Sequence, residues 1–208
     1  MPKAFVPLLG RPLLWHCVQG LLASGCVELV VVAVGIQYRG QARAALVDAG
    51  ERVQIVAGGA QRSDSVREAL QSVPDAEVVL VHDAARCLTP VSVIQAVVAA
   101  VLAGQRAVVP VLTVVDTIKQ VGTDGRVVAT VDRAALRVVQ TPQGFAADLL
   151  RRAHQVPSGP VTDDAGLVER LGETVTTLAG HPHAFKITTP FDLVVAEAVA
   201  GARATGRA

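Results

Sequence analysis

A charged pair follows the most apolar strand-like run of this chain. Residues 78–81 are uninterrupted and mostly β-branched, as in a central strand covered on both faces, and Asp83 and Arg86 follow within a few residues. Ligands of open parallel sheets bind at the carboxyl ends of the strands, so this anion and this cation lie where chemistry would be done. An ordinary ion pair that closes the strand is the alternative.

A glycine-rich turn is the second cluster that could do chemistry. Gly58 and Gly59 follow another strand-like run and lead into a helix that contains Ser65. Backbone N–H groups at such a turn could hold a phosphate, or the ribose and base of a nucleotide. The turn matches neither a Walker loop nor GxGxxG. A turn whose Ser63 or Asp64 caps the helix is the alternative.

Four cations are candidates for phosphate binding: Lys3, Arg86, Arg133 and Lys186. Lys186 stands in an apolar stretch just before a helix, so its ammonium either points into a cleft or snorkels to the surface. Asp83 is available for a metal ion. The sequence has no Ser/His/Asp order, zincin motif or paired-carboxylate signature. The set therefore indicates handling of phosphates rather than hydrolysis by a side-chain nucleophile.

Two further polar groups have a structural alternative. His82 beside Asp83 could act as a general base, or it could only form a hydrogen bond at the strand end. Thr162, Asp163 and Asp164 open a helix, where such residues commonly serve as N-caps.

Strands and helices alternate along the first 112 residues. We expect helices at 12–22, 41–48, 63–70 and 91–102, and strands at 28–34, 53–56, 78–82 and 107–112. This order predicts an α/β fold with a mostly parallel sheet and helices on both faces. Further on, helices are expected at 146–154, from 162 and after 190, with a strand at 174–178 and a frayed tail over 201–208.

A β-hairpin interrupts the alternation. Residues 114–121 and 126–131 have strand character on either side of a turn at residues 122–125. Because no helix covers it, we expect an arm at about 113–133 that buries its apolar face on a second subunit; folding back onto its own domain is the alternative. Without repeats or linkers, residues 1–208 are predicted to form one domain plus this arm.

Composition excludes several classes of protein. The net charge is +1, with 19 basic and 18 acidic residues, so no overall field draws the chain to nucleic acid or to a membrane. The three cysteines form no CxxC pair, which favours a reducing compartment. The sequence shows neither a bilayer-spanning apolar run nor a signal-peptide pattern. We expect a cytoplasmic protein with no nucleic-acid or membrane partner.

Six motifs in this order and spacing resemble one family. They occupy residues 58–66, 81–86, 116–119, 140–145, 162–165 and 186–189. The chain resembles the 2-C-methyl-D-erythritol 4-phosphate cytidylyltransferases of the non-mevalonate isoprenoid pathway, over essentially its whole length from Pro2. Each motif alone is modest evidence, whereas six in register are specific.

The resemblance implies a fold, substrates and residue roles. The fold is a Rossmann-type fold like that of the nucleotide-diphospho-sugar transferases, and the protein is a homodimer with interlocked arms. The substrates are CTP and a sugar-alcohol phosphate, with a divalent metal ion, Mg²⁺, as cofactor and pyrophosphate as the leaving group. The implied catalytic residues are Lys3, Arg133 and Lys186, with Arg133 reaching into the partner's site. Asp83, Arg86, Thr117, Thr141 and Thr162 match the polyol phosphate site, and Gly58, Gly59, Ser65 and Ala84 match the cytidine side.

One departure from the family pattern concerns the beginning of the chain. The family starts with a strand and a loop of the form Ala-Ala-Gly-x-Gly-x-Arg, whereas this sequence starts with Met1, Pro2 and Lys3. We expect the true start to lie upstream, because everything after residue 2 has the family's pattern. The alternatives are a cytidylyltransferase for another polyol phosphate, such as ribitol 5-phosphate, and a catalytically silent truncated homologue.

Overall fold

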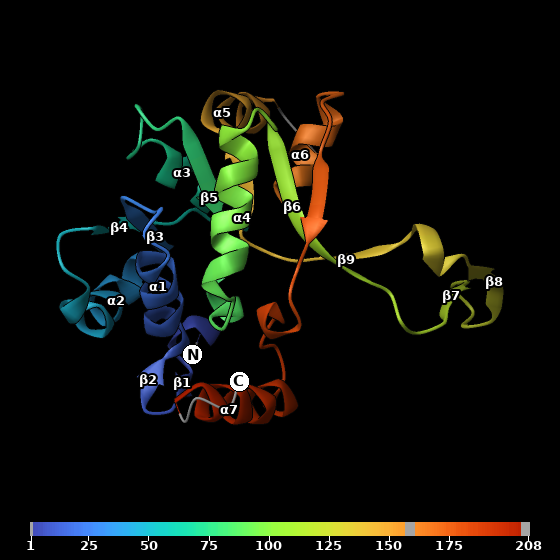
Figure 1. Ribbon diagram of the computed structural model, residues 1–208, viewed down its shortest axis with the longest axis horizontal. Helices are drawn as coiled ribbons and strands as arrows, with labels where there is room; N and C mark the ends of the chain where they lie inside the picture. Colours follow the sequence, from blue (N-terminus) through green and yellow to red (C-terminus); the bar gives the residue numbers. More distant parts are fainter. Residues whose placement is uncertain (1, 157–160, 205–208) are drawn as a thin grey trace.

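The computed structural model describes residues 2–156 and 161–204, and Figure 1 shows helices packed around a central sheet. Its helices are α1 (Leu13–Ala23), α2 (Arg39–Ala45), α3 (Arg62–Leu70), α4 (Val91–Leu102), α5 (Ala147–Gln155), α6 (Ala165–Arg170) and α7 (Pro190–Ala204). Every expected helix is present. The tail predicted over 201–208 is helical as far as residue 204, and residues 205–208 lie outside the described residues.

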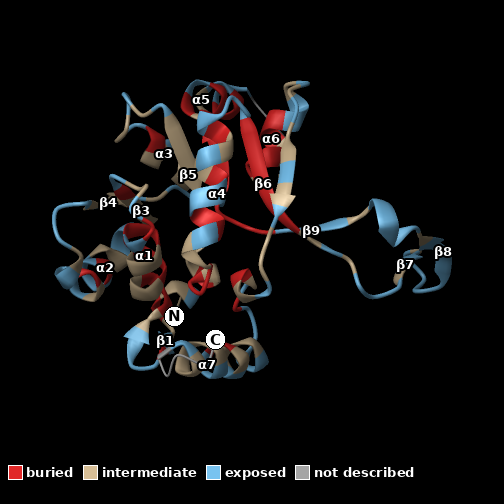
Figure 2. Cartoon of the chain, viewed as in Figure 1, coloured by how far each residue is buried: buried red, intermediate tan, exposed pale blue. Residues whose placement is uncertain are grey.

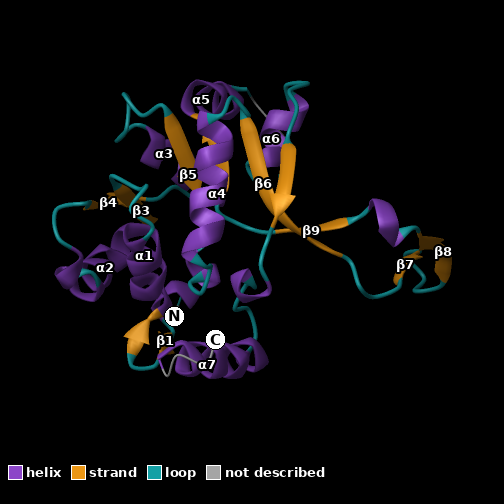
Figure 3. Cartoon of the chain, viewed as in Figure 1, coloured by secondary structure: helices purple, strands orange, loops and turns teal. Residues whose placement is uncertain are grey.

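The strands also follow the predicted order, with four additions. They are β1 (Pro7–Leu8), β2 (Arg11–Pro12), β3 (Val30–Val34), β4 (Val53–Ala57), β5 (Val78–Val81), β6 (Ala107–Thr113), β7 (Ile118–Val121), β8 (Val127–Val131), β9 (Arg137–Val139), β10 (Gln143–Ala146) and β11 (Thr176–Ala179). The strands β1, β2, β9 and β10 were not expected. Figure 3 shows where the helices and the strands lie in the fold.

The predicted α/β fold is confirmed, and the main sheet is mixed: β11, β6 and β5 run in the same direction, whereas β10 runs antiparallel between β6 and β5. Its order is β11-β6-β10-β5, and β9 also pairs with β6. Only β11 and β6 are parallel neighbours in this sheet, whereas β10 is antiparallel to both β5 and β6. The connection from β5 through α4 to β6 leaves room for one strand, and β10 fills it after the chain returns from the arm.

The smaller parallel pair β3–β4 is a separate sheet. It carries α2 and packs against the first helix, α1, within the larger of the hydrophobic clusters. Both β3 and β5 are therefore end strands of their own sheets in this structure.

The core lies on both faces of the main sheet (Figure 2). Side chains alternate along β10, so its neighbouring residues face opposite layers. Phe145 is fully buried in one cluster with Leu149 of α5 and Leu167 of α6. Gly144 faces the other layer, where a Cβ atom would lie 2.4 Å from Cγ1 of Val97 in α4. The strand is thus held between α4 on one face and α5 and α6 on the other.

The predicted hairpin is present and projects from the sheet, at the right of Figure 1. Its strands β7 and β8 pair antiparallel, with a register shift between Gln120 and Val121. Val121, Val127 and Val128 are exposed, each by more than half of its surface. The hairpin therefore presents apolar surface that its own domain does not cover.

None of the described helices, in residues 2–156 and 161–204, has the length and apolar character needed to cross a membrane.

The close approach of α4 to β10 generates a stability prediction. We expect Gly144→Ala to lower the free energy of unfolding by about 1 to 3 kcal/mol, because the new methyl group must displace packed side chains. Denaturant unfolding measures the change. The matched control is Gly20→Ala in α1, where a Cβ meets nothing within 4 Å; it should stabilise by up to about 1 kcal/mol through helix propensity. Equal stability of Gly144→Ala and the unsubstituted protein would contradict the packing described here.

Candidate active site

The carboxylate of Asp83 is the centre of the candidate site. It follows β5, as the apolar run predicted. Its Oδ2 lies 2.8 Å from Nζ of Lys186 and 4.0 Å from Nε of Arg86, and its Oδ1 lies 3.7 Å from Nε of Arg62. Cations from three segments that are distant in the sequence therefore converge on one carboxylate.

The protonation state of Asp83 follows from these neighbours. Burial by itself would raise the pKa of this carboxyl. The hydrogen bond from Lys186 and the positive charges of Lys186, Arg62 and Arg86 outweigh burial and lower the pKa below its ordinary value. Asp83 is therefore an anion at neutral pH.

Thr141 fixes the end of β5. It precedes β10, and because β10 is antiparallel to β5, the start of one strand lies beside the end of the other. The hydroxyl oxygen of Thr141 accepts a hydrogen bond from the N–H of Asp83 at 3.0 Å. Nδ1 of His82 lies 2.7 Å from the same oxygen. The structural alternative for His82, a hydrogen bond at the strand end, is thus what the structure shows.

Arg86 belongs to the 3-10 helix η4 (Ala84–Arg86) and holds the loop that precedes Lys186. Its guanidinium donates to the carbonyl oxygens of Ala184, at 2.8 Å, and Val139, at 3.2 Å. Its Nε is buried without a hydrogen-bond partner among the described residues. Burial lowers the pKa of Arg86, and the charge of Asp83 opposes that effect.

Lys186 sits on an extended segment that is tied to the same helix. The N–H of Ile187 donates to the carbonyl of Ala85 at 2.8 Å, so the backbone around Lys186 is fixed against η4. The Lys186 side chain itself is 46% exposed, whereas that of Asp83 is only 18% exposed. The ammonium can therefore leave the carboxylate for an incoming anion without a rearrangement of the backbone.

The glycine turn packs tightly onto the start of α3. The N–H of Gly58 donates to the carbonyl of Val34 at 2.8 Å, and the N–H of Gly59 donates to Oγ of Ser65 at 3.1 Å. A Cβ on Gly58 would lie 2.8 Å from Oγ of Ser65, and one on Gly59 would lie 2.2 Å from Cβ of Asp64. Position 59 thus requires glycine, whereas a Cβ on Gly58 would force the Ser65 hydroxyl to move. Asp64 accepts from the N–H of Gln61, which supports the predicted helix cap.

Arg62, in the first turn of α3, joins the glycine turn to the rest of the site. Its Nη1 donates to Oδ2 of Asp164 at 2.6 Å, and Oδ1 of Asp164 lies 3.0 Å from Nε2 of His154. The pKa of Arg62 is raised: burial lowers it, but the charge and hydrogen bond of Asp164 and the charge of Asp83 prevail. None of Arg62, Asp164 and His154 was predicted from the sequence to take part in the chemistry. A signal existed for Arg62, a cation inside the glycine-rich motif, and for Asp164, which lies in the motif at residues 162–165, but none existed for His154.

Thr162 lies beside this network, at the start of α6. Its neighbour Asp163 accepts from the N–H of Gly166 at 3.1 Å, which is the predicted capping role. Asp163 also accepts from the side-chain amide of Gln143 at 2.7 Å. Thr162 itself is exposed.

The remaining predicted residues fall into two groups. Lys3 lies in the 3-10 helix η1 (Lys3–Phe5), which packs beside η4 and Ala84. Thr117 and Arg133 belong to the arm, whose strands β7 and β8 project away from β5, the strand that Asp83 follows (Figure 1). The Arg133 guanidinium donates to the carbonyl of Val115. One chain therefore brings together Asp83, Arg86, Thr141 and Lys186, but not the two arm residues.

A bound metal ion would need oxygen or nitrogen ligands grouped in space. Among the described residues, no three His, Cys, Asp or Glu side chains form such a group. Both oxygens of Asp83 face cations. The described residues thus contain no ready-made group of metal ligands.

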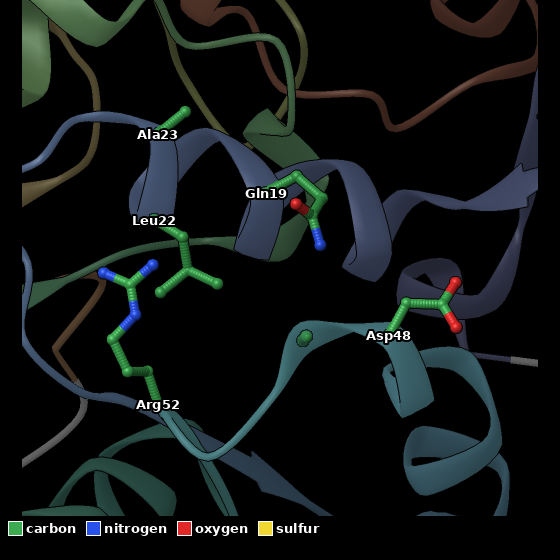
Figure 4. A pocket seen from close by; sticks show the side chains of 6 residues that line it. Gln19, Leu22, Ala23, Asp48 and Arg52 are labelled. Carbon is green, nitrogen blue, oxygen red and sulfur yellow. The ribbon is translucent and has the colours of Figure 1, made fainter.

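A surface cavity elsewhere on the molecule is unrelated to this cluster. It lies between α1 and the chain that leads into β4 (Figure 4). Its lining residues are Gln19, Leu22, Ala23, Asp48, Ala49 and Arg52. No predicted site residue is among them.

Comparison with known proteins agrees with the motif pattern. The family model described as 2-C-methyl-D-erythritol 4-phosphate cytidylyltransferase matches residues 1–202. A protein of that name from Nocardia farcinica is 56% identical over 203 residues, which are 98% of this chain and 87% of that protein. One from Saccharopolyspora erythraea is 57% identical, covering 96% and 91%. The crystal structure of one from Thermus thermophilus is 38% identical and superposes with a TM-score of 0.81, covering 96% and 94%.

The chain is therefore a nucleotidyltransferase with an α/β fold. It belongs to the 2-C-methyl-D-erythritol 4-phosphate cytidylyltransferase family, and its reaction is cytidylyl transfer to that polyol phosphate in isoprenoid biosynthesis. The relatives named above give no support to the alternatives, ribitol 5-phosphate as acceptor or a catalytically silent homologue.

The environment of His82 generates a prediction for the pH dependence of stability. Burial lowers the pKa of His82 from 6.5 to about 4; Asp83 opposes this shift and Arg86 adds to it. Between these values the unfolded chain binds a proton that the folded protein does not, so stability falls as the pH drops from 6.5 towards 4.

Thermal unfolding at about pH 7 and about pH 5 measures the effect. The unfolding temperature should drop more for the unsubstituted protein than for His82→Asn, which keeps a hydrogen-bonding group for Thr141 but does not titrate. An equal drop in both proteins would contradict the assignment.

Proposed function

We propose that the cytidylyl transfer takes place at the cluster of cations that converge on Asp83. A phosphate oxygen of the polyol phosphate attacks the α-phosphorus of CTP, and pyrophosphate leaves in line. No side chain becomes covalently attached. Catalysis then consists of holding the two substrates in line and neutralising charge on the phosphate oxygens. The observation that carries this proposal is the short contact between Lys186 and Asp83, with Arg62 and Arg86 beside it.

The main obstacle to the reaction is repulsion between two polyanions. We propose that Lys186 and Arg133 neutralise the polyol phosphate and that Lys3 acts on the triphosphate. Asp83 holds the Lys186 ammonium in place before the substrate arrives. The half-exposed Lys186 side chain then exchanges the carboxylate for phosphate. Arg86 and Thr141 already have protein partners, so they shape the polyol site, together with Thr117 and Thr162.

The cytidine side of the proposed site is the glycine turn. Gly58 and Gly59 let the backbone pass close to α3, and Ser65 fixes the turn through its hydroxyl. Ala84 is the first residue of η4, which follows the end of β5, and we assign it to the same side of the site. Small residues here leave room for a base and ribose.

A divalent ion, Mg²⁺, is the proposed cofactor. Mg²⁺ is commonly held by one or two carboxylates together with the phosphates of a substrate. Asp83 is the one carboxylate among the predicted site residues. To bind the ion it would have to release Lys186 or Arg62, and we therefore assign most of the ligands to the nucleotide.

We propose that the protein is a cytoplasmic homodimer of a single domain, residues 1–208, joined through the arm. The exposed valines of β7 and β8 need a cover that their own domain does not provide. Arg133 then reaches the partner's polyol phosphate, since it lies away from Asp83 of its own chain. All three cysteines are free, in keeping with a reducing compartment.

Substitution of Lys186 tests the proposed site. We expect Lys186→Ala in the full-length protein to lower the rate of pyrophosphate release from CTP and 2-C-methyl-D-erythritol 4-phosphate by about a hundred- to a thousandfold. The fold should survive, because about half of the side chain is exposed. The control, Arg43→Ala, removes an exposed cation from α2 and should leave the rate unchanged. Near-normal turnover of Lys186→Ala would refute the proposal.

Mixing two inactive variants tests whether Arg133 acts across subunits. Lys186→Ala and Arg133→Ala are purified separately, then unfolded together and refolded. If arms are exchanged, half of the dimers are mixed and each has one intact site, so about a quarter of the normal activity should return. Recovery of no activity, with dimers present by light scattering, would show that Arg133 does not serve the partner's site.

A further inference from the structure

A line of polar contacts runs from the interior of the protein to Lys186. It begins at His154 on α5, continues through Asp164 and Arg62, and reaches Lys186 through Asp83. The successive contacts are 3.0 Å, 2.6 Å, 3.7 Å and 2.8 Å. The first two contacts, His154–Asp164 and Asp164–Arg62, lie on the side of Arg62 that is away from Lys186. They have no part in the proposed chemistry.

The inner end of this line is buried. The side chains of Asp164 and His154 are 1% and 3% exposed. A carboxylate so removed from water is costly unless it is paired and hydrogen-bonded. Asp164 meets this requirement with one oxygen on Arg62 and the other on His154. The Asp164 carboxylate is thus held in one position, and it in turn holds the Arg62 guanidinium that it binds.

The guanidinium of Arg62 consequently spans two carboxylates. Its Nη1 is taken by Asp164, which leaves Nε directed at Oδ1 of Asp83. The other oxygen of Asp83, Oδ2, is left to Lys186. Without Arg62 at Oδ1, both oxygens of Asp83 would be open to the ammonium, which would then be held more strongly and in a different place.

We infer that Asp164 and His154 are positioning residues for cytidylyl transfer: they hold Arg62 on one oxygen of Asp83 and so set where Lys186 stands. This inference rests on the proposed function of Lys186. It also gives Arg62 a second task, because the residue opens α3 and thereby links the glycine turn on the cytidine side to the cations on the polyol side.

The first test is a double-mutant cycle in the full-length protein. Asp164→Asn keeps the shape of the side chain but removes its charge. We expect kcat to fall about ten- to a hundredfold, because a small misplacement of a catalytic group lowers the rate on that scale. Because the effect passes through Lys186, Asp164→Asn should add almost nothing to the loss in a Lys186→Ala background. Independent effects would instead multiply.

The matched control is Asp148→Asn. It removes an ion pair with Arg106 from α5, the helix that carries His154, but both partners are exposed and lie outside this line of contacts. This variant should retain the normal kcat. His154→Gln should lower kcat less than Asp164→Asn, because Arg62 then keeps its anion.

A second variant keeps the inference testable if Asp164→Asn does not fold. Arg62→Lys retains a charge at a side chain that is 39% exposed, but it cannot span two carboxylates. It should fold with a normal unfolding temperature and lose kcat on the same scale, again only when Lys186 is present. Normal kcat in the folded variants, or losses that multiply with Lys186→Ala, would overturn the inference. Normal turnover of Lys186→Ala alone would instead defeat the proposed function.

Discussion

The anion at Asp83 is the interaction on which the rest of the site depends. A carboxylate that is largely covered by protein needs positive partners, because burial alone would favour its neutral form. Here the partners come from the first turn of α3, from η4 and from the segment before α7. Satisfying this one charge therefore draws together three parts of the chain that the sequence separates widely.

The three cations are not equivalent, and the difference suggests how the site works. Arg86 is tied to backbone carbonyls and Arg62 to the buried Asp164, so both belong to the framework. Lys186 has Asp83 as its close partner and is the most exposed of the three. In the proposed mechanism the two arginines hold the carboxylate, and the lysine exchanges it for a phosphate. The chemistry that the family performs, joining two polyanions, requires such a transferable charge.

The fold was predictable wherever one element carries its own signal. Helices such as α4, an apolar run between Pro90 and Gly104, were predicted from periodicity and caps. The strand β10 was not, because Gln143 and Gly144 have no strand preference, and the strand exists only through its two neighbours and the helix above it. The same strand makes the sheet mixed. Pairing between distant segments is decided by the space that other elements leave, which local patterns do not report.

The sequence by itself identified the candidate groups: the glycine turn, the charged end of β5, Lys186 and the arm, whose order along the chain also identifies the family. Only the tertiary structure decided which of these groups meet. It placed Thr141 against His82 through an antiparallel pairing, and it joined Arg62 to Asp164, 102 residues away. The physical reason is that charge and hydrogen-bond partners are chosen by proximity in space. A buried carboxylate such as Asp164 is indistinguishable from an ordinary helix cap until the fold has removed it from water.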